Sequence, residues 1–284
     1  MKIAVTGSRG KVGRAAVAAL RKAGHRVIGL DLAADPADAF SVAVDCSDFG
    51  QTMGALSGVD AVGSTPDAVL HLAGIPRPGP APDHIIFSNN LAASYNIFSA
   101  CARLGISKVV WASSETILGL PFSAPPAFAP LDESHPDRPN WSYALSKHLG
   151  EAAADQFVRW HPELSIVSLR FSNVYGDEDY DQIAAIQTRP ESRKFNLWGY
   201  VDAEDCATAC RLAIEAELTG HHRLIIAAAD NIAGQPSLDL MERYFPGVPL
   251  DPGLDGEQSL LSSQQAEATI GYTPQFSWRD RVNR

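Results

Sequence analysis

The sequence predicts an α/β protein built on a doubly wound parallel sheet, and three observations support that fold class. The chain opens with a short apolar run, a glycine-rich turn, an amphipathic stretch and a second apolar run. Further apolar runs then alternate with stretches of helical periodicity as far as residue 228. Several apolar runs stop at acidic or small polar residues, and a doubly wound sheet binds its ligand at those strand ends.

Composition narrows the function classes. The 284 residues are 45% hydrophobic and 20% charged, which is typical of one large globular domain or of one domain with a smaller cap. A net charge of −10 argues against a nucleic-acid surface. No apolar run is long enough to span a membrane, and the chain starts directly with a strand pattern, not a signal peptide. We therefore expect a cytoplasmic protein without nucleic-acid or membrane partners.

Cysteine usage gives no metal site. Cys206 and Cys210 stand four positions apart on a predicted helix, but no second pair or histidine partner completes a ligand set. Buried thiols are the expected state of all four cysteines, which include Cys46 and Cys101. We expect no metal.

The first strand is expected at Lys2–Thr6. The turn that follows contains Gly7, Gly10 and Gly13. A helix comes next and ends at Gly24, and its apolar stripe consists of Val12, Ala15, Ala16, Ala19 and Leu20. The second buried strand, Arg26–Leu30, stops at Asp31.

This opening βαβ unit is typical of a dinucleotide site. Glycines allow backbone N–H groups to approach a pyrophosphate at the helix N-terminus. The carboxylate of Asp31 would accept hydrogen bonds from both adenosine ribose hydroxyls and would repel a 2′-phosphate, so NAD is favoured over NADP. The glycine spacing is GxxGxxG, not the common GxGxxG, so the flanking strands and Asp31 carry the argument. The alternative is an ordinary βα turn with surface glycines.

The remaining elements follow the same alternation. Further strands are expected at Phe40–Val44, Asp67–Leu72, Lys108–Ala112, Leu164–Phe171 and His222–Ala228. Helices are expected at Asp83–Leu104, around Tyr143 and Lys147, and at Ala203–Glu217. The Ile75–Pro82 stretch is predicted to be a loop beside the site. The prolines between 121 and 139 predict an irregular segment that forms a wall or lid of the pocket.

The pattern loosens after residue 171, which suggests two parts. We expect a dinucleotide-binding domain of residues 1–171 with 201–229, and a substrate-binding cap of residues 172–200 with 230–284. Short helices and turns are expected after Asp230. Asp202 and Asp205 fit the start of a helix, and the histidines fit structural roles.

Tyr143 and Lys147 share one helix face because they stand four positions apart. The YxxxK motif is short and also fits an aromatic residue beside a solvated lysine. The stretch SSETILG, Ser113–Gly119, lies after the fifth strand on the side of the expected dinucleotide, and this placement favours catalysis.

A tyrosine base near neutral pH needs its pKa lowered by roughly three units, about 4 kcal/mol. An ammonium group ~4–5 Å away supplies up to about 4 kcal/mol at an effective dielectric of ~20. Tyr143 would then take the proton of a substrate hydroxyl, Ser114 would hold the oxygen, and hydride would pass to the nicotinamide. Lys147 would also bind the nicotinamide ribose.

The chain resembles the extended short-chain dehydrogenase/reductases of the NAD-dependent epimerase/dehydratase family, which have a Rossmann fold. The matching motifs are TGSRGKVG, Asp31, Asp45, HLAG, NLAASYN, SSETILG, YALSK and LRFSNVYG, in the order of the family and over most of the chain.

This resemblance implies a set of NAD contacts. Arg9–Val12 would contact the pyrophosphate, Asp45 and Cys46 would flank the adenine, and Asn90 would order a water next to Lys147. The implied cofactor residues are Gly7, Arg9, Gly10, Lys11, Val12, Gly13, Asp31, Leu32, Asp45, Cys46, Leu72, Ala73, Gly74, Asn90, Ala112, Tyr143, Lys147, Phe171, Asn173 and Val174. The family pattern also implies a homodimer formed by the helices that contain Asn90 and Tyr143.

Departures from the family pattern bear on the substrate. Leu118 replaces the usual tyrosine, and Glu115–Thr116 does not reproduce the acidic pair of dehydratases, which argues against dehydration. The short interval from Gly176 to Tyr200 leaves little chain to hold a nucleotide diphosphate, and in this the protein resembles uronate dehydrogenases. The expected substrate-binding residues are Ser114, Glu115, Thr116, Tyr143, Asn173 and Arg193.

By the same resemblance, Arg193 is the candidate for binding a substrate carboxylate, since a guanidinium pairs with carboxylate in a two-pronged manner. The alternative is that Arg189, Arg193 and Lys194 form a solvated turn.

Three functions remain open at this point. The first is an NAD-dependent oxidoreductase that acts on a hydroxyl or carbonyl of a free sugar or sugar acid. The second is a nucleotide-sugar epimerase that retains its NAD. The third is a non-enzymatic dinucleotide sensor, and the tyrosine–lysine pair argues against it.

Overall fold

The computed structural model describes residues 1–58, 64–76, 79–122 and 124–282. Within them, seven parallel strands form one sheet in the order β3-β2-β1-β4-β5-β6-β9. These strands are β1 (Lys2–Thr6), β2 (Arg26–Asp31), β3 (Ser41–Ala43), β4 (Ala68–His71), β5 (Lys108–Ser114), β6 (Ser165–Phe171) and β9 (Gly220–Ile226). A separate pair consists of β7 (Val174–Tyr175) and β8 (Val201–Asp202).

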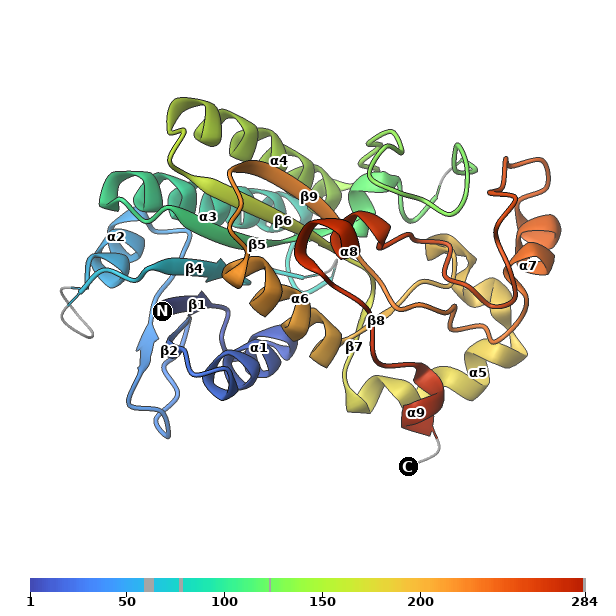
Figure 1. Ribbon diagram of the computed structural model, residues 1–284, viewed down its shortest axis with the longest axis horizontal. Coiled ribbons are helices and arrows are strands. Elements are labelled where there is room, and N and C mark those ends of the chain that lie inside the picture. The colour runs from blue at the N-terminus through green and yellow to red at the C-terminus, as the bar shows by residue number, and fades with distance from the viewer. Residues whose placement is uncertain (59–63, 77–78, 123, 283–284) are drawn as a thin grey trace.

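Helices cover both faces of the sheet. α1 (Lys11–Lys22) packs beside α6 (Ala203–Glu215) on one face, and α2 (Phe49–Ser57), α3 (Asp83–Leu104) and α4 (Ser142–Trp160) lie together on the other (Figure 1). The shorter helices are α5 (Ile183–Thr188), α7 (Ser237–Tyr244), α8 (Gln264–Ile270) and α9 (Trp278–Val282). The predicted doubly wound α/β class is confirmed.

Three short 3-10 turns lie at or near the strand ends. They are η1 (Glu115–Leu118), η2 (Asp177–Gln182) and η3 (Pro190–Asn196). η1 follows β5 directly, whereas η2 and η3 belong to the part of the molecule that carries α5, α7 and α9 (Figure 1).

The predicted strands form within two residues of the expected bounds, and β9 shows what determines those bounds. It starts at Gly220 and ends at Ile226, two residues earlier than expected, because its ladder with β6 pairs Gly220 with Ser165 and Ile226 with Phe171. The next amide, that of Ala227, bonds the Ser263 hydroxyl at 3.0 Å instead.

Helix α2 was not predicted from the sequence. Its segment, FGQTMGALS, contains two glycines and no clear apolar stripe. The helix begins where the Asp48 carboxylate accepts a hydrogen bond from the Gln51 amide at 2.9 Å, and it ends at Gly58 in the left-handed region. Of the predicted Ile75–Pro82 loop, residues 77 and 78 lie outside the described residues.

Apolar side chains form three clusters. One fills the space between the sheet and α1 and α6, around Leu20 and Ile214. Another lies under α2, α3 and α4, around Phe98 and Trp111. The third is built around Trp198 and includes residues from segments 118–131, 175–200 and 225–261. This third cluster packs the loops beyond the carboxyl ends of the strands.

A buried carboxylate holds α4 to the sheet. Glu151, which is 1% exposed, accepts hydrogen bonds from Arg170 Nε at 2.9 Å, Arg170 Nη2 at 2.7 Å and Ser113 Oγ at 2.6 Å. Arg223 Nε donates to the same carboxylate at 3.0 Å. Burial opposes ionisation of Glu151, but the bonds from Arg170 outweigh it and lower the pKa. One side chain of α4 is thereby joined to β5, β6 and β9.

Close packing supports the same contact. A Cβ at Gly150 would lie 2.6 Å from Cη2 of Trp111, so only glycine lets α4 approach β5 this closely. The Trp111 indole in turn donates to the Ser168 hydroxyl at 2.5 Å.

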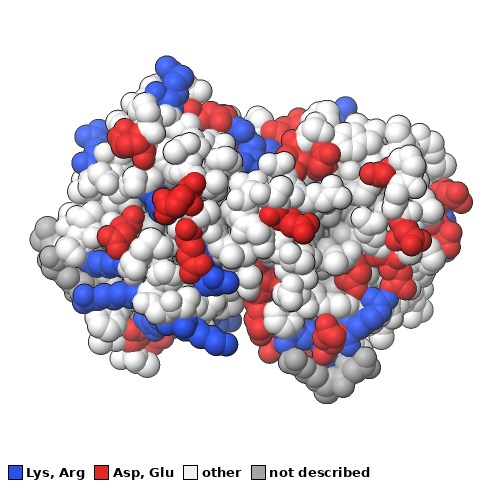
Figure 2. Space-filling model, viewed as in Figure 1, with Lys and Arg blue, Asp and Glu red and all other residues white. Residues whose placement is uncertain are grey.

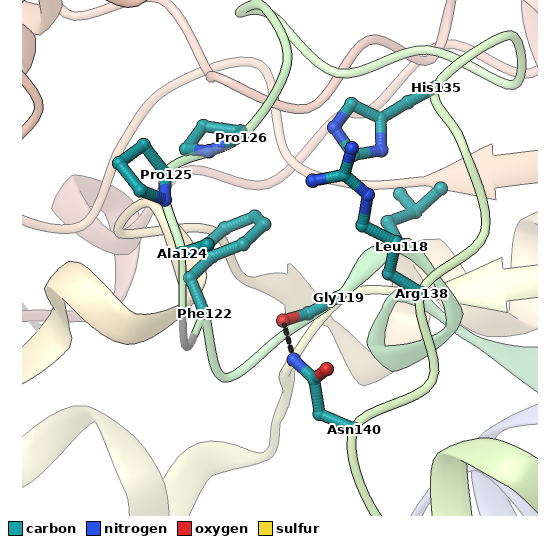
Figure 3. Close-up of a pocket in the computed structure, with 9 residues that line it drawn as sticks. All are labelled: Leu118, Gly119, Phe122, Ala124, Pro125, Pro126, His135, Arg138 and Asn140. Atoms are coloured by element: carbon teal, nitrogen blue, oxygen red, sulfur yellow. Dashed lines mark hydrogen bonds between the residues drawn. The ribbon is translucent and has the colours of Figure 1, made fainter.

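The proline-rich segment is irregular, as expected, and lines a small cavity of about 20 Å³ (Figure 3). Phe122 and Pro126 face His135 and Arg138 across it, and Asn140 donates to the Gly119 carbonyl at 2.7 Å. That volume holds about one water molecule, so the cavity is too small for an organic ligand.

Charged side chains of both signs are mixed on the face shown in Figure 2. In the described segments, no helix is both long enough and apolar enough to cross a bilayer. The same residues contain no group of three or more histidine, cysteine or acidic side chains arranged to hold a metal ion.

Arg170→Met tests the network around Glu151. Removing the guanidinium leaves a buried carboxylate without its main partner, and we expect the free energy of unfolding to fall by about 3–5 kcal/mol. Urea denaturation measures this change. The control is Arg211→Met, which breaks a partly exposed pair with Glu215 and should cost about 0.5 kcal/mol or less. Equal losses in the two variants would contradict a special role for Arg170.

Candidate active site

The glycine turn after β1 has little room for side chains. Gly7 has a φ of +65°, and a Cβ on it would lie 2.7 Å from the Ala73 amide nitrogen. A Cβ on Gly13 would collide with the Gly7 carbonyl. The turn therefore packs against the end of β4 and leaves the N-terminus of α1 open to a ligand.

A cavity of about 740 Å³ lies at this turn, a size suited to a cofactor. The predicted cofactor residues that line it are Gly7, Arg9, Gly10, Lys11, Val12, Gly13, Asp31, Leu32, Asp45, Cys46, Leu72, Ala73, Gly74 and Val174. The structure thus brings together residues from the ends of β1, β2 and β4, the segment after β3, and β7.

Several lining residues were not identified from the sequence: Val44, Ser47, Ile75, Pro76, Asn89 and Ala93. Four of them extend predicted motifs by one or two positions. Asn89 and Ala93 stand four apart on α3, so their helical spacing could have indicated a shared face.

Asp31 lies at the cavity edge at the end of β2. Its carboxylate accepts hydrogen bonds from the Arg9 amide at 2.9 Å and from the Leu32 amide at 2.8 Å. Each oxygen of an ionised carboxylate has further acceptor capacity. The side chain is therefore held in place with acceptor sites left for hydroxyl groups.

These features fit a dinucleotide. The open helix N-terminus suits a pyrophosphate, the fixed carboxylate of Asp31 suits a ribose diol, and the glycine contacts leave backbone within reach of both.

Six predicted cofactor residues do not line this cavity: Asn90, Ala112, Tyr143, Lys147, Phe171 and Asn173. Lys147 is nevertheless adjacent to it, because a Cβ on the lining residue Gly74 would stand 4.0 Å from Lys147 Nζ. Lys147 donates to the Ala112 carbonyl at 2.7 Å. Asn90 bonds both backbone polar groups of Ile75, at 2.8 and 3.0 Å, and so fixes the loop after β4.

Tyr143 and Lys147 lie on one face of α4, as expected from their spacing. Lys147 Nζ is 5.6 Å from the centre of the Tyr143 ring, and both side chains are buried. Trp141 stacks on the Tyr143 ring with 5.1 Å between ring centres. The Ser114 hydroxyl at the end of β5 lies close enough to the Tyr143 phenol to lower its pKa.

The expected lowering of the Tyr143 pKa is wrong for the protein alone. Burial raises the pKa of Tyr143 to about 12, the nearby Ser114 hydroxyl opposes the rise in part, and Glu115 adds to it. Burial also lowers the pKa of Lys147 to about 8, although Glu151 favours its charged form. The attraction of an ammonium at an effective dielectric of ~20 does not offset the cost of burying the phenolate itself.

Polar side chains with unused hydrogen-bonding capacity gather beyond Ser114. Arg193 is half-buried, and its guanidinium stacks on the Phe195 ring at 4.8 Å. In the described part of the chain, Arg193 Nε and Nη2, Tyr175 Oη and Asn196 Oδ1 are buried and lack hydrogen-bond partners. Arg189 and Lys194, in contrast, are exposed. Arg193 therefore differs from the solvated turn around it.

Thr116 and Asn173 flank this group. The Thr116 hydroxyl and amide both donate to Ser114 Oγ, at 3.0 and 3.2 Å. The Asn173 side chain lies near the Tyr175 phenol and lowers its pKa in part. Phe171 ends β6 in the apolar cluster below.

Lys11 links the cavity of about 740 Å³ at the glycine turn, called the dinucleotide cavity below, to η2. It forms an ion pair with Asp179, whose carboxylate also accepts from the Gly176 amide at 2.7 Å, and its Nζ is 3.7 Å from Glu178. The sequence contained no signal for this long-range pair.

The remaining candidates have structural roles. His71 is buried and bonds the Thr6 hydroxyl at 2.7 Å, and burial lowers its pKa to about 3, so the ring is neutral. Asp202 caps α6, as expected, by accepting from the Glu204 amide at 2.8 Å. Asp205 does more than start that helix, since it accepts from the amides of Gln275 and Phe276 at 3.0 Å.

Comparison with known proteins agrees with this geometry. An NAD-dependent glucose-6-phosphate dehydrogenase from Haloferax volcanii is 25% identical over 88% of this chain and 98% of its own. A crystal structure of a short-chain dehydrogenase/reductase superfamily protein from Agrobacterium tumefaciens with bound NAD is 26% identical, with a TM-score of 0.71 over 100% of this chain and 95% of that one.

A mutated uronate dehydrogenase shares the fold, with a TM-score of 0.69, 21% identity, and coverage of 99% of this chain and 85% of its own. The model of the NAD dependent epimerase/dehydratase family matches residues 3–227. The chain belongs to the NAD dependent epimerase/dehydratase family, and its cofactor is NAD.

Proposed function

We propose that this protein is an NAD-dependent oxidoreductase that oxidises a hydroxyl of a free sugar or sugar acid, or reduces the corresponding carbonyl. The observation that carries the proposal is the meeting of Ser114, Tyr143 and Lys147 beside the dinucleotide cavity. A hydroxyl, a phenol and an ammonium at one point are the groups needed to move a proton on and off a substrate oxygen.

Tyr143 is the proposed acid and base. Its phenol lies near the Ser114 hydroxyl, so a substrate hydroxyl placed between the two comes within proton-transfer reach. When bound, NAD in its oxidised form supplies the hydride acceptor and a positive charge. A phenol with a pKa raised to about 12 holds its proton at neutral pH, so in the reductive direction Tyr143 is ready to donate it.

Lys147 is proposed to assist Tyr143 by charge and position. Its pKa of about 8 keeps most molecules protonated at neutral pH, and its bond to the Ala112 carbonyl fixes the ammonium beside the Tyr143 ring. A fixed positive charge stabilises the phenolate during proton transfer.

Arg193 supports an acidic substrate. A guanidinium with two buried nitrogens that lack hydrogen-bond partners in the described chain is costly unless a ligand pairs with them. Carboxylate and phosphate oxygens match its planar donors. We propose a carboxylate, as in a uronic acid, and a sugar phosphate is the alternative that a substrate panel distinguishes.

Nucleotide-sugar epimerisation is the second candidate, because the family includes epimerases by its own description. The two functions differ in their products. A dehydrogenase accumulates NADH with a free uronate or aldose, whereas an epimerase retains its NAD and forms no net NADH.

We also propose a homodimer in which α3 and α4 meet their copies. Large apolar side chains are exposed on both helices: Ile85, Tyr95, Leu145 and Trp160. Exposed apolar side chains on adjoining helices favour a protein contact.

Tyr143→Phe tests the proposed acid and base. Loss of the hydroxyl should reduce kcat by about 10²–10⁴-fold because it removes the proposed proton donor and acceptor beside Ser114, while NAD affinity stays nearly unchanged. NADH absorbance with uronates, aldoses and UDP-sugars measures turnover, and fluorescence titration measures NAD binding. The control, Tyr244→Phe, removes a phenol from α7. Turnover in Tyr143→Phe close to that of the control would refute the assignment.

Asp31→Ala tests the proposed preference for NAD over NADP. We expect NAD to bind about 10- to 100-fold more weakly, because two hydrogen bonds to a charged acceptor are lost, and NADP to be less strongly excluded. Binding titrations with both dinucleotides give the ratio. Asp239→Ala, on the exposed face of α7, controls for net charge. An unchanged preference for NAD over NADP in Asp31→Ala would contradict the proposed role of Asp31.

Arg193→Met tests the acidic substrate. The KM for the preferred uronate should rise about 10- to 100-fold with loss of the guanidinium, and the KM for the matching neutral aldose should change little. Assaying a hexose 6-phosphate in parallel distinguishes carboxylate from phosphate. Arg189→Met provides the exposed control. Equal changes with acidic and neutral sugars would favour a solvated turn.

A further inference from the structure

Glu115 is the buried acid of the site for which the proposed reaction assigns no step. It follows Ser114 directly, and its side chain turns inward, leaving the residue 5% exposed. The Ser172 hydroxyl donates to its Oε2 at 2.5 Å, and the Asn196 amide donates to its Oε1 at 3.4 Å. Both partners are neutral, and among the residues that the structure describes no cation bonds this carboxyl directly.

Other titratable groups face Glu115 from each side. Tyr143 lies on α4, Tyr175 on β7 and Arg193 on η3, and each interacts electrostatically with Glu115. Asp179, on η2, acts on Tyr175 and belongs to the same surroundings. Arg193 is the one cation among these four, and its Nε and Nη2 have no hydrogen-bond partner in the described part of the chain.

The charge state of Glu115 is balanced near neutral pH. Burial raises the pKa of Glu115 to about 7, while the bonds from Ser172 and Asn196 and the charge of Arg193 limit the rise. The group is therefore mostly neutral below about pH 7 and mostly ionised above it.

An acidic substrate alters this balance. A carboxylate at Arg193 would stand close to a second carboxylate if Glu115 were ionised, and one guanidinium does not compensate two buried anions. A protonated Glu115 avoids the repulsion and offers an O–H donor to the bound anion. A neutral sugar, with a hydroxymethyl group in place of the carboxylate, does not require Glu115 to be protonated.

We propose that Glu115 is a specificity-determining residue that binds the acidic group of the substrate in its neutral, protonated form, so that an acidic sugar enters the site together with one proton. The inference rests on the proposed function and names how its substrate class is recognised. The proton comes from solvent and resides on the Glu115 carboxyl, which donates it as a hydrogen bond to a substrate oxygen. No bond to carbon changes in this step.

The same proton favours the chemistry. An ionised Glu115 raises the pKa of Tyr143 and so opposes the phenolate that accepts a substrate proton. Glu115 held neutral by the bound acid removes that repulsion. Binding of an acidic substrate thus makes Tyr143 easier to deprotonate, and Tyr143 is the base that acts on this substrate.

The test compares wild-type protein with Glu115→Gln, whose amide is neutral and close in shape to the protonated acid. D-glucuronate and D-galacturonate are the acidic probes, with D-glucose and D-galactose as their neutral counterparts. KM is measured across pH, and calorimetry of uronate binding to the NADH-loaded protein in two buffers counts the protons taken up. Glu191→Gln is the matched control, since Glu191 is an exposed acid in η3.

For the wild type and the Glu191→Gln control we expect the KM for the uronate to rise by up to about tenfold per pH unit above the Glu115 pKa, with up to one proton taken up on binding. The KM for the aldose should stay level. In Glu115→Gln both KM profiles should be level from about pH 6 to pH 7.5, below the Lys147 pKa of about 8, and the proton uptake assigned to Glu115 should disappear.

Three results would overturn the inference: no proton uptake by the wild type, the same pH dependence in wild type and Glu115→Gln, or equal pH dependence with acidic and neutral sugars. Failure of the proposed function is separate. Uronate that binds with proton uptake but never yields NADH would refute the dehydrogenase and leave the role of Glu115 intact. Absence of uronate binding to the wild type at any pH would refute both. Retained NADH binding and thermal unfolding would show that Glu115→Gln is folded.

Discussion

The packing of α4 over the carboxyl end of β5 is the constraint on which the rest of the site depends. Glu151 joins the helix to three strands, and Gly150 allows it to approach Trp111 without a Cβ between them. Tyr143 and Lys147 lie on this helix, and Ser114 ends the strand beneath it. A shift of α4 by one turn, about 5.4 Å, would separate the phenol from the hydroxyl. Buried ion pairs contribute little net stability. The main effect of the ion pairs of Glu151 is therefore to fix the position of α4 on the sheet.

The site is a group of ionisable side chains in a low-dielectric surrounding. Burial acts against each charged form: it raises the pKa values of Tyr143 and Glu115 and lowers that of Lys147. Charges that arrive with ligands consequently have large effects on the groups already present. If the substrate is acidic, as we propose, the cofactor and the substrate each bring charge, and binding is then coupled to proton transfer in this site.

Sequence reasoning was strongest where local chemistry determines structure. The strand Lys2–Thr6, the helix Asp83–Leu104 and the cavity residues near Asp31 follow from hydrophobic period, glycine placement and strand-end acids. It was less accurate where contacts between distant segments determine the structure. α2 has weak helix propensity, and the start of β9 depends on its register with β6.

Within the site, the direction of the Tyr143 pKa was wrong because burial cannot be read from a motif. Nothing in the sequence near Lys11 indicated its pairing with Asp179. The unpaired nitrogens of Arg193 and the neutral partners of Glu115 likewise became visible only when segments distant in the chain were brought together. These contacts are long-range, and they concern the substrate end of the site more than the cofactor end.

The central claim is that the phenol of Tyr143 faces a nicotinamide held by the glycine turn at Gly7. A crystal structure with NAD bound tests it most directly. The account predicts the pyrophosphate at the N-terminus of α1, and the nicotinamide ring opening onto the same space as the Tyr143 hydroxyl, with room for a substrate carbon about 3–3.5 Å from the ring. A nicotinamide directed away from Tyr143, or a dinucleotide bound elsewhere than at the glycine turn, would contradict it.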